Sequence, residues 1–324
     1  MIVVLAQLLA QLICVYFVIA EDMSALVEAP IIIAVFGANG NISSNVLSHL
    51  ERTVGNEHVG TCISNFKVRI ITRNPELLPT TGYKFIHEVV RGSIDDIHLL
   101  GENLKGVSRV FFCLPQEFSS ADMIRVSNQF ADSAEAAGVQ VVVRISSYGI
   151  DSSSATTCSQ GTLGGAHIAG EQYMKEKGLI LTSIRPTSFF TNFLKYDAPS
   201  IRTVGSFYSP LGDSAAVNWI SCDDISAVVA CALLNTSLDG RVLDITGSEK
   251  NTLTAEAMRQ LIQLKTGKMV SYIELPLPDS IEMNGLWTFL RAGGFCHNTN
   301  TFEEVTGRPP TEFSEFLGTI LDKV

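Results

Sequence analysis

A glycine-containing turn separates the first strongly apolar run of the chain from the first helical pattern. Residues 31–36 are all apolar, and apolar side chains recur at helical intervals from 42 to 50. Glycines between such segments let the backbone approach a pyrophosphate, which then meets the N–H groups of the helix N-terminus. Ser43 stands where these turns carry a third glycine, a change that should loosen helix–strand packing slightly. An ordinary strand–helix turn is the alternative. The residues expected to bind a dinucleotide are Gly37, Ala38, Asn39, Gly40, Asn41 and Ile42.

The second strand-like run, residues 66–72, is followed by Arg73 with no acidic residue beside it. In dinucleotide sites an acid at this place binds a free 2′-hydroxyl. A guanidinium instead suits a 2′-phosphate, through paired charge-assisted hydrogen bonds. The sequence therefore favours NADP as the cofactor, with NAD as the other possibility. The competing interpretation of Arg73 is a solvated arginine at a strand end.

A histidine and a glutamate lie four residues apart, at His167 and Glu171, on one face of a predicted helix. We expect His167 to line the nicotinamide pocket and to donate a proton, with Glu171 holding the ring. The alternative is a histidine near a helix N-terminus that does no chemistry. A metal pair is not expected, because no third histidine, cysteine or carboxylate is spaced nearby to complete a site. The seven cysteines are dispersed and show no C-x-x-C spacing.

The elements that must position these residues alternate between strands and helices. Such alternation predicts a parallel sheet covered on both faces. The fold class is therefore α/β: a Rossmann-type doubly wound parallel sheet over residues 30–186, with a smaller C-terminal α/β substrate lobe over 187–324 that is interleaved with it. The expected strands are 31–36, 66–72, 84–90, 107–114, 139–145, 179–185, 217–220 and 241–245. The expected helices are 41–52, 93–104, 121–137, 166–177, 223–234, 254–265 and 311–321.

Composition excludes several classes of protein. The 324 residues carry 23 basic and 33 acidic side chains, a net charge of −10. An acidic chain is a poor ligand for nucleic acid, whose phosphates reward a basic surface. Apolar residues make up 46% and charged residues 17%, which excludes a disordered protein. We therefore expect a small-molecule substrate and no nucleic-acid partner.

The N-terminal 22 residues are considered apart from the fold. Residues 1–20 contain no charged side chain, and a run of this length could be a cleaved signal, a membrane anchor or an extension before a true start at Met23. Asn41-Ile42-Ser43 is a glycosylation sequon inside the expected cofactor turn, and a glycan there would block the site. We therefore expect a cytoplasmic protein. Secretion, or membrane anchoring through residues 1–20, is the alternative.

The order of these motifs resembles the NmrA-like family of atypical short-chain dehydrogenases/reductases over about residues 31–320. Within that family, the H-x-x-x-E spacing at His167 is most similar to the quinone oxidoreductase and azoreductase-like branch. The matching segments are Gly37 to Ser43, the strand ending at Arg73, Val90 to Asp96, Val110 to Phe112, Ile145 to Ser147, His167 to Glu171, Gly178, Ile184 to Pro186, Phe189 to Phe193 and Thr306 to Pro310.

The resemblance implies an oxidoreductase that transfers hydride from NADPH to a quinone or similar conjugated carbonyl. Ordinary short-chain reductases use a Tyr-x-x-x-Lys pair, but here the tyrosine place holds Leu163 and the lysine place holds His167. The Tyr173-x-x-x-Lys177 sequence falls at the far end of the helix, away from nicotinamide. A non-catalytic NADP(H) sensor acting through a protein partner fits the missing pair equally. By the same resemblance, the further site residues are Ser147 in catalysis, and Ser93, Leu114 and Pro186 at the cofactor.

Replacing Arg73 should change the choice of cofactor. We expect Arg73→Ala to weaken NADP(H) binding by ~1.5–3 kcal/mol, the contribution of hydrogen bonds to a charged group, and to leave NAD(H) binding nearly unchanged. Fluorescence titration with both cofactors measures this. Equal affinities of the unmutated protein for NADPH and NADH would contradict the prediction.

Overall fold

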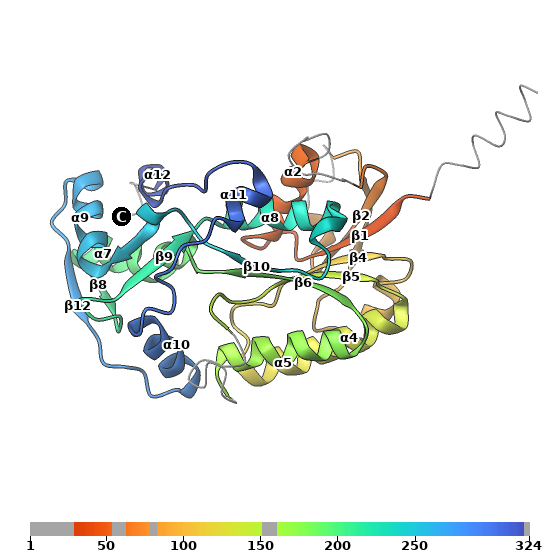
Figure 1. Cartoon of the computed structure of the whole chain (residues 1–324), viewed down its shortest axis with the longest axis horizontal. Coiled ribbons are helices and arrows are strands. Elements are labelled where there is room, and N and C mark those ends of the chain that lie inside the picture. Colours follow the sequence, from red (N-terminus) through yellow and green to blue (C-terminus); the bar gives the residue numbers. More distant parts are fainter. Residues whose placement is uncertain (1–28, 54–62, 78–82, 151–160, 321–324) are drawn as a thin grey trace, which may run out of the picture.

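A sheet of seven parallel strands forms the centre of the computed structural model, which describes residues 29–53, 63–77, 83–150 and 161–320. The strand order is β10-β6-β5-β4-β1-β2-β3, so chain order reverses between β1 and β4 (Figure 1). Ligands in such sheets bind outside the carboxyl ends of the strands at this reversal. The predicted doubly wound α/β fold is confirmed, while the leader, residues 1–22, lies outside the described residues. The strands are β1 (Ile31–Phe36), β2 (Phe66–Thr72), β3 (Ile86–Arg91), β4 (Arg109–Phe112), β5 (Val141–Ile145), β6 (Ile180–Pro186) and β10 (Val242–Ile245).

The strands of this sheet are rich in apolar residues because helices cover both faces. Ile33 and Val35 point to one face and Ala34 and Phe36 to the other, and all four are at most 4% exposed. One face packs against α2 (Ser43–Thr53), α8 (Cys222–Leu234) and α11 (Thr301–Thr306). The other packs against α3 (Ile97–Asn103), α4 (Ser120–Ala137) and α5 (Leu163–Glu176). Figure 1 shows α4 and α5 on this side of the sheet.

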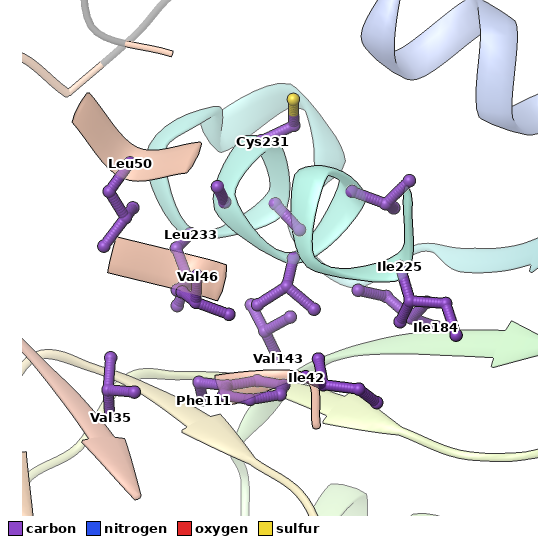
Figure 2. Close-up of a cluster of buried hydrophobic side chains, with 14 of the residues drawn as sticks. Val35, Ile42, Val46, Leu50, Phe111, Val143, Ile184, Ile225, Cys231 and Leu233 are labelled. Atoms are coloured by element: carbon purple, nitrogen blue, oxygen red, sulfur yellow. The ribbon is translucent and has the colours of Figure 1, made fainter. Parts of the chain in front are cut away.

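The layer between α2, α8 and the sheet is a continuous apolar core. Figure 2 shows Val46 of α2 and Ile225 of α8 on the helix side, with Phe111 and Val143 on the sheet side. Because α8 and β10 come from the C-terminal half of the chain, that half contributes both a helix and an edge strand to the N-terminal layer. Residues from both halves of the chain therefore share one core layer.

The helix predicted from Ser93 begins four residues later, at Ile97, with Asp96 as its N-cap residue. Ser93 is instead part of a turn: its hydroxyl donates to the Asp95 carboxylate and its carbonyl accepts from the Asp96 N–H at 3.2 Å. Because its hydroxyl is hydrogen-bonded to Asp95, Ser93 does not cap the helix as the sequence pattern predicted.

The C-terminal lobe is built from short strands and helices beyond β6. Strand β9 (Ala216–Ile220) pairs with β7 (Ser188–Phe189) in parallel and with β11 (Thr252–Thr254) antiparallel, while β8 (Ser206–Ser209) pairs in parallel with β12 (Ser271–Glu274). Only β9 was predicted, because the other strands are too short for periodicity to show. The helices are α6 (Phe190–Asn192), a π-helical turn η3 (Phe193–Asp197), α7 (Ala198–Val204), α9 (Ala255–Thr266), α10 (Ile281–Arg291) and α12 (Phe313–Thr319), and the 3₁₀ turns are η2 (Pro75–Leu77), η4 (Thr236–Leu238) and η5 (Glu249–Asn251).

A fully buried arginine lies between β5 and α5. Arg144 is 0% exposed; its guanidinium donates to the Ser127 hydroxyl at 3.2 Å and stacks over the Phe112 ring at 5.2 Å. It reaches this place because α5 carries Gly170 opposite it. A Cβ on Gly170 would lie 2.5 Å from Nη1 and 2.8 Å from Nη2 of Arg144. The missing side chain is therefore what makes room for the cation.

Adding that methyl group should destabilise the fold. We expect Gly170→Ala to lower the free energy of unfolding by ~1–3 kcal/mol through overpacking, although alanine forms helices better. The matched control is Gly101→Ala, in the exposed middle of α3, where a Cβ meets nothing within 4 Å and should stabilise by about 0.5–1 kcal/mol. Urea unfolding measures both. Stabilisation of similar size in the two variants would show that the space beside Arg144 is not closed.

Candidate active site

The predicted cofactor turn is a tight backbone turn between β1 and α2. Gly37 adopts φ +63°, which favours glycine, and its N–H donates to the Ile71 carbonyl at 2.9 Å. The Gly40 N–H donates to the Gly37 carbonyl at 2.7 Å, and a Cβ on Gly40 would lie 3.2 Å from that oxygen. Asn39 and Asn41 are exposed while Ala38 and Ile42 are buried, so the turn backbone faces solvent on an apolar base. Ser43 is buried without disrupting the start of α2.

Helix α8 supports this turn from behind. The Ser226 hydroxyl donates to the Ile42 carbonyl at 2.8 Å, and His49 of α2 contacts the Asp223 carboxylate at 2.9 Å. These contacts connect the C-terminal half directly to the cofactor turn, and sequence analysis did not predict them.

The other predicted cofactor residues lie along the same carboxyl edge. Arg73 follows β2 with an exposed side chain that has no partner in the described part of the chain. Ser93 follows β3 and is half-buried, and Leu114 lies two residues beyond β4. Pro186 ends β6, where its carbonyl accepts from the Tyr148 N–H at 3.0 Å. The edge thus brings these residues together with the glycine turn, and their contact with a cofactor stays a prediction.

Glu171 is held by an arginine that the sequence analysis overlooked. Its carboxylate accepts from Arg185 Nη2 at 2.7 Å and from Nε at 3.3 Å, and Glu171 is only 3% exposed. Burial raises the pKa of Glu171, but the hydrogen bonds from Arg185 and Ser146 and the charges of Arg185 and Arg144 outweigh that effect, and the net pKa is lowered. Arg185 also donates to the Ile150 carbonyl at 2.8 Å, which attaches the segment after β5.

The expectation that Glu171 holds His167 is therefore wrong. His167 is half-buried, and its Nδ1 atom is buried with no partner among the described residues. Burial, followed by the positive charge of Arg144, lowers the pKa of His167 to about 3, and the negative charge of Glu171 offsets this only in part. At neutral pH the ring is uncharged. One ring nitrogen can then donate a hydrogen bond and the other can accept one, but there is no imidazolium proton to transfer.

Two further polar side chains, Ser146 and Asp244, lie near the pair of Glu171 and Arg185. The buried Ser146 hydroxyl after β5 faces the Glu171 carboxylate and helps to lower its pKa. Asp244 Oδ1 on β10 is buried and unpaired among the described residues. Asp244 lies opposite Arg185 in strand register, and burial raises its pKa. Buried polar groups are normally hydrogen-bonded, so the unpaired Asp244 Oδ1 and His167 Nδ1 atoms at the edge where ligands bind indicate a site for a polar ligand.

Ser147 is half-buried beside Ser146, and its hydroxyl makes only a long 3.5 Å contact to the Tyr148 carbonyl. The Ser147 hydroxyl is thus available to a ligand at the carboxyl end of β5, and its role stays a prediction.

Tyr173 and Lys177 face away from this edge, toward α4. The Tyr173 hydroxyl donates to Asp132 at 3.0 Å, and Lys177 pairs with Asp132 at 2.7 Å.

Sequence analysis missed Arg144, Arg185 and Asp244 as members of this cluster. One signal was available, because Arg144 is a charged residue within the otherwise apolar run Val141 to Ile145. Burying a cation in a strand covered on both faces is costly unless the charge is paired or hydrogen-bonded.

Among the described residues, no three histidine, cysteine or acidic side chains are grouped as a metal site. In that same part of the chain, no helix has both the length and the apolar character to cross a membrane.

The pH dependence of stability should show whether His167 is uncharged in the folded protein. Between pH 6.5, the ordinary pKa, and about 3, the pKa in the fold, the unfolded chain binds a proton that the folded protein does not. Stability therefore falls as pH falls through this window. We expect the unfolding free energy of the wild type to decline more steeply below pH 6.5 than that of His167→Gln, in parallel urea titrations. A shallower wild-type decline would show a protonated ring held by Glu171.

Comparison with known proteins places this geometry in a family. Residues 31–315 match the NmrA-like family. A (4-alkanoyl-5-oxo-2,5-dihydrofuran-3-yl)methyl phosphate reductase of Streptomyces griseus is 29% identical over 276 residues, which cover 81% of this chain and 93% of that protein. An NAD(P)H azoreductase of Xenophilus azovorans is 28% identical over 71% of this chain and 81% of its own length. The structure of an NADPH-dependent quinone oxidoreductase of Escherichia coli, complexed with NADPH, superposes with a TM-score of 0.73 at 22% identity, over 89% and 99% of the two chains. The chain belongs to the NmrA-like family.

Proposed function

We propose that the protein is an NADPH-dependent reductase that transfers hydride to a small conjugated acceptor, a quinone or a similar conjugated carbonyl. The observation that carries this proposal is the buried, unpaired Nδ1 atom of His167 at the carboxyl edge that also holds the glycine turn. The two curated relatives support it, because both are named as reductases.

The residues of the edge fit the cofactor. Gly37, Gly40 and Asn41 of the turn are exposed, so their backbone is accessible to a pyrophosphate. A side chain on Gly40 would crowd the Gly37 carbonyl. Arg73 offers an unpaired guanidinium for a 2′-phosphate. When bound, NADPH supplies a hydride from C4 of its nicotinamide. NAD(H) would use the same turn but leave Arg73 without a phosphate to bind.

The class of acceptor is inferred from the side chains that could serve as a general acid. Tyr173 and Lys177 are committed to α4, and His167 is uncharged at neutral pH. Such a site suits an acceptor that needs little help from a general acid, as quinones do, because their reduced oxygens are relatively weak bases. The relatives' names describe an azo compound and an unsaturated acyl lactone, both of which are conjugated hydride acceptors.

Within this mechanism, the side chains orient the acceptor and stabilise charge. A neutral His167 can donate one hydrogen bond to an acceptor oxygen. Arg144, whose pKa is lowered by burial only to about 10, stays cationic. Its charge stabilises the negative charge that develops on the acceptor as hydride arrives. Water then supplies the proton that completes the reduction.

We also propose a cytoplasmic location. The support is the sequon at Asn41, an exposed residue of the cofactor turn, where a glycan would obstruct binding. A chain beginning at Met23 should then be soluble and should bind NADPH.

Turnover against a panel of acceptors tests the function. We expect the protein to oxidise NADPH with simple quinones or conjugated lactones, and Gly40→Val to lose both binding and turnover. His167→Ala should lower kcat by about tenfold, the effect of one lost hydrogen bond to developing charge, with NADPH affinity preserved. Tyr173→Phe is the control and should change neither quantity.

Three outcomes would contradict this proposal. A large rate loss in Tyr173→Phe with none in His167→Ala would reverse the roles of the two residues. A sharp kcat transition near the ordinary histidine pKa would show an imidazolium donor. Tight NADPH binding without turnover of any acceptor would instead support a dinucleotide sensor acting through a protein partner.

A further inference from the structure

Two arginines meet at the carboxyl ends of the neighbouring strands β2 and β3. Arg73 directly follows Thr72, which pairs with Arg91 in strand register. Both side chains are exposed. Arg91 Nη1 donates to the Arg73 carbonyl at 2.6 Å, and Nη2 donates to the Glu76 carboxylate at 3.2 Å. The guanidinium of Arg91 therefore lies against the backbone of Arg73, within the turn that follows β2.

We propose that Arg91 joins Arg73 in binding the 2′-phosphate of NADP(H), and that Glu76 competes with the phosphate for Arg91. This inference rests on the proposed function, since it concerns the same cofactor, and it assigns specificity to residues that motif spacing did not indicate.

The Arg91 side chain has donors to spare. A guanidinium carries five N–H groups in a planar fork, and the two contacts above use one on each terminal nitrogen. The remaining donors match the paired geometry that arginine presents to phosphate oxygens. Arg73 has no side-chain partner in the described part of the chain, so its own fork is available as well.

The backbone beneath Arg91 is held in place. Asn103 of α3 donates through its side-chain amide to the Arg91 carbonyl at 3.2 Å. The next residue, Gly92, is packed so closely that a Cβ would lie 2.2 Å from that amide nitrogen. The Arg91 side chain thus extends from a fixed backbone toward the Arg73 turn. This reduces the conformational entropy that is lost when the side chain binds a phosphate.

A phosphate can displace the Glu76 carboxylate from Arg91. Its pair with Arg91 joins two exposed side chains, and exposed ion pairs contribute little to stability. A doubly charged phosphate between two guanidiniums forms more charge-assisted hydrogen bonds than one carboxylate does. The acidic side chain nevertheless remains near the phosphate and repels it, so removing its charge should strengthen binding.

Binding of nucleotide fragments to the full cofactor-free chain tests this inference. The probes are 2′,5′-ADP, which carries the 2′-phosphate, and 5′-ADP, which does not, titrated by calorimetry. We expect Arg91→Met to weaken binding of 2′,5′-ADP on the order of tenfold, and Arg73→Met to weaken it at least as much, with binding of 5′-ADP unchanged in both. Glu76→Gln should tighten 2′,5′-ADP a few-fold. The matched control is Arg125→Met, which removes another exposed, ion-paired arginine, on α4, and should alter neither probe.

The outcomes separate this inference from the proposed function. If Arg91→Met behaves like the Arg125 control while Arg73→Met loses the preference for 2′,5′-ADP, Arg91 is a surface contact and the inference is wrong, although the cofactor assignment stands. Equal weakening of both probes by Arg91→Met would show a structural role and overturn the inference. A wild type that does not distinguish the probes would overturn the NADP(H) preference itself, and this inference with it.

Discussion

The ion pair between Glu171 and Arg185 holds the candidate site together. It joins α5 to β6, and the same guanidinium attaches the segment after β5 through the Ile150 carbonyl. Three separate parts of the chain thus meet at one buried contact. Removing either partner of such a pair leaves an uncompensated charge, typically at a cost of ~3–5 kcal/mol. The position of His167, one turn before Glu171 on α5, depends on this contact.

Arg144 gives the site its electrostatic character. Its charge lies beneath α5 without a carboxylate partner among the described residues, and it helps to keep His167 uncharged. Burial also raises the pKa of the nearby Cys113 thiol to about 12, so this sulfur stays protonated despite the cation. A fixed positive charge beside neutral hydrogen-bonding groups favours a reaction in which negative charge appears on the ligand.

The C-terminal half connects this site to the cofactor turn. Asp224 of α8 is fully buried and accepts from the Thr311 N–H at 2.7 Å, while Arg308 pairs with the same carboxylate at 2.7 Å. Ser226, two residues along α8, bonds the Ile42 carbonyl. Arg308 and Thr311 thus anchor the chain after α11 to the helix that supports the glycine turn.

Features that depend on near neighbours in the chain could be predicted from the residue pattern alone. It predicted β1 and β2 at their observed bounds, the glycine turn between β1 and α2, and the end of α4 at Ala137, because apolar periodicity and glycine conformation act over a few residues. The three-dimensional fold was needed to show that Glu171 binds Arg185 rather than His167, that Arg144 occupies the space left by Gly170, and that β10 forms an edge of the large sheet. Each of these joins residues far apart in the chain. Burial and competition among several charged partners select such contacts, and no local spacing encodes the outcome.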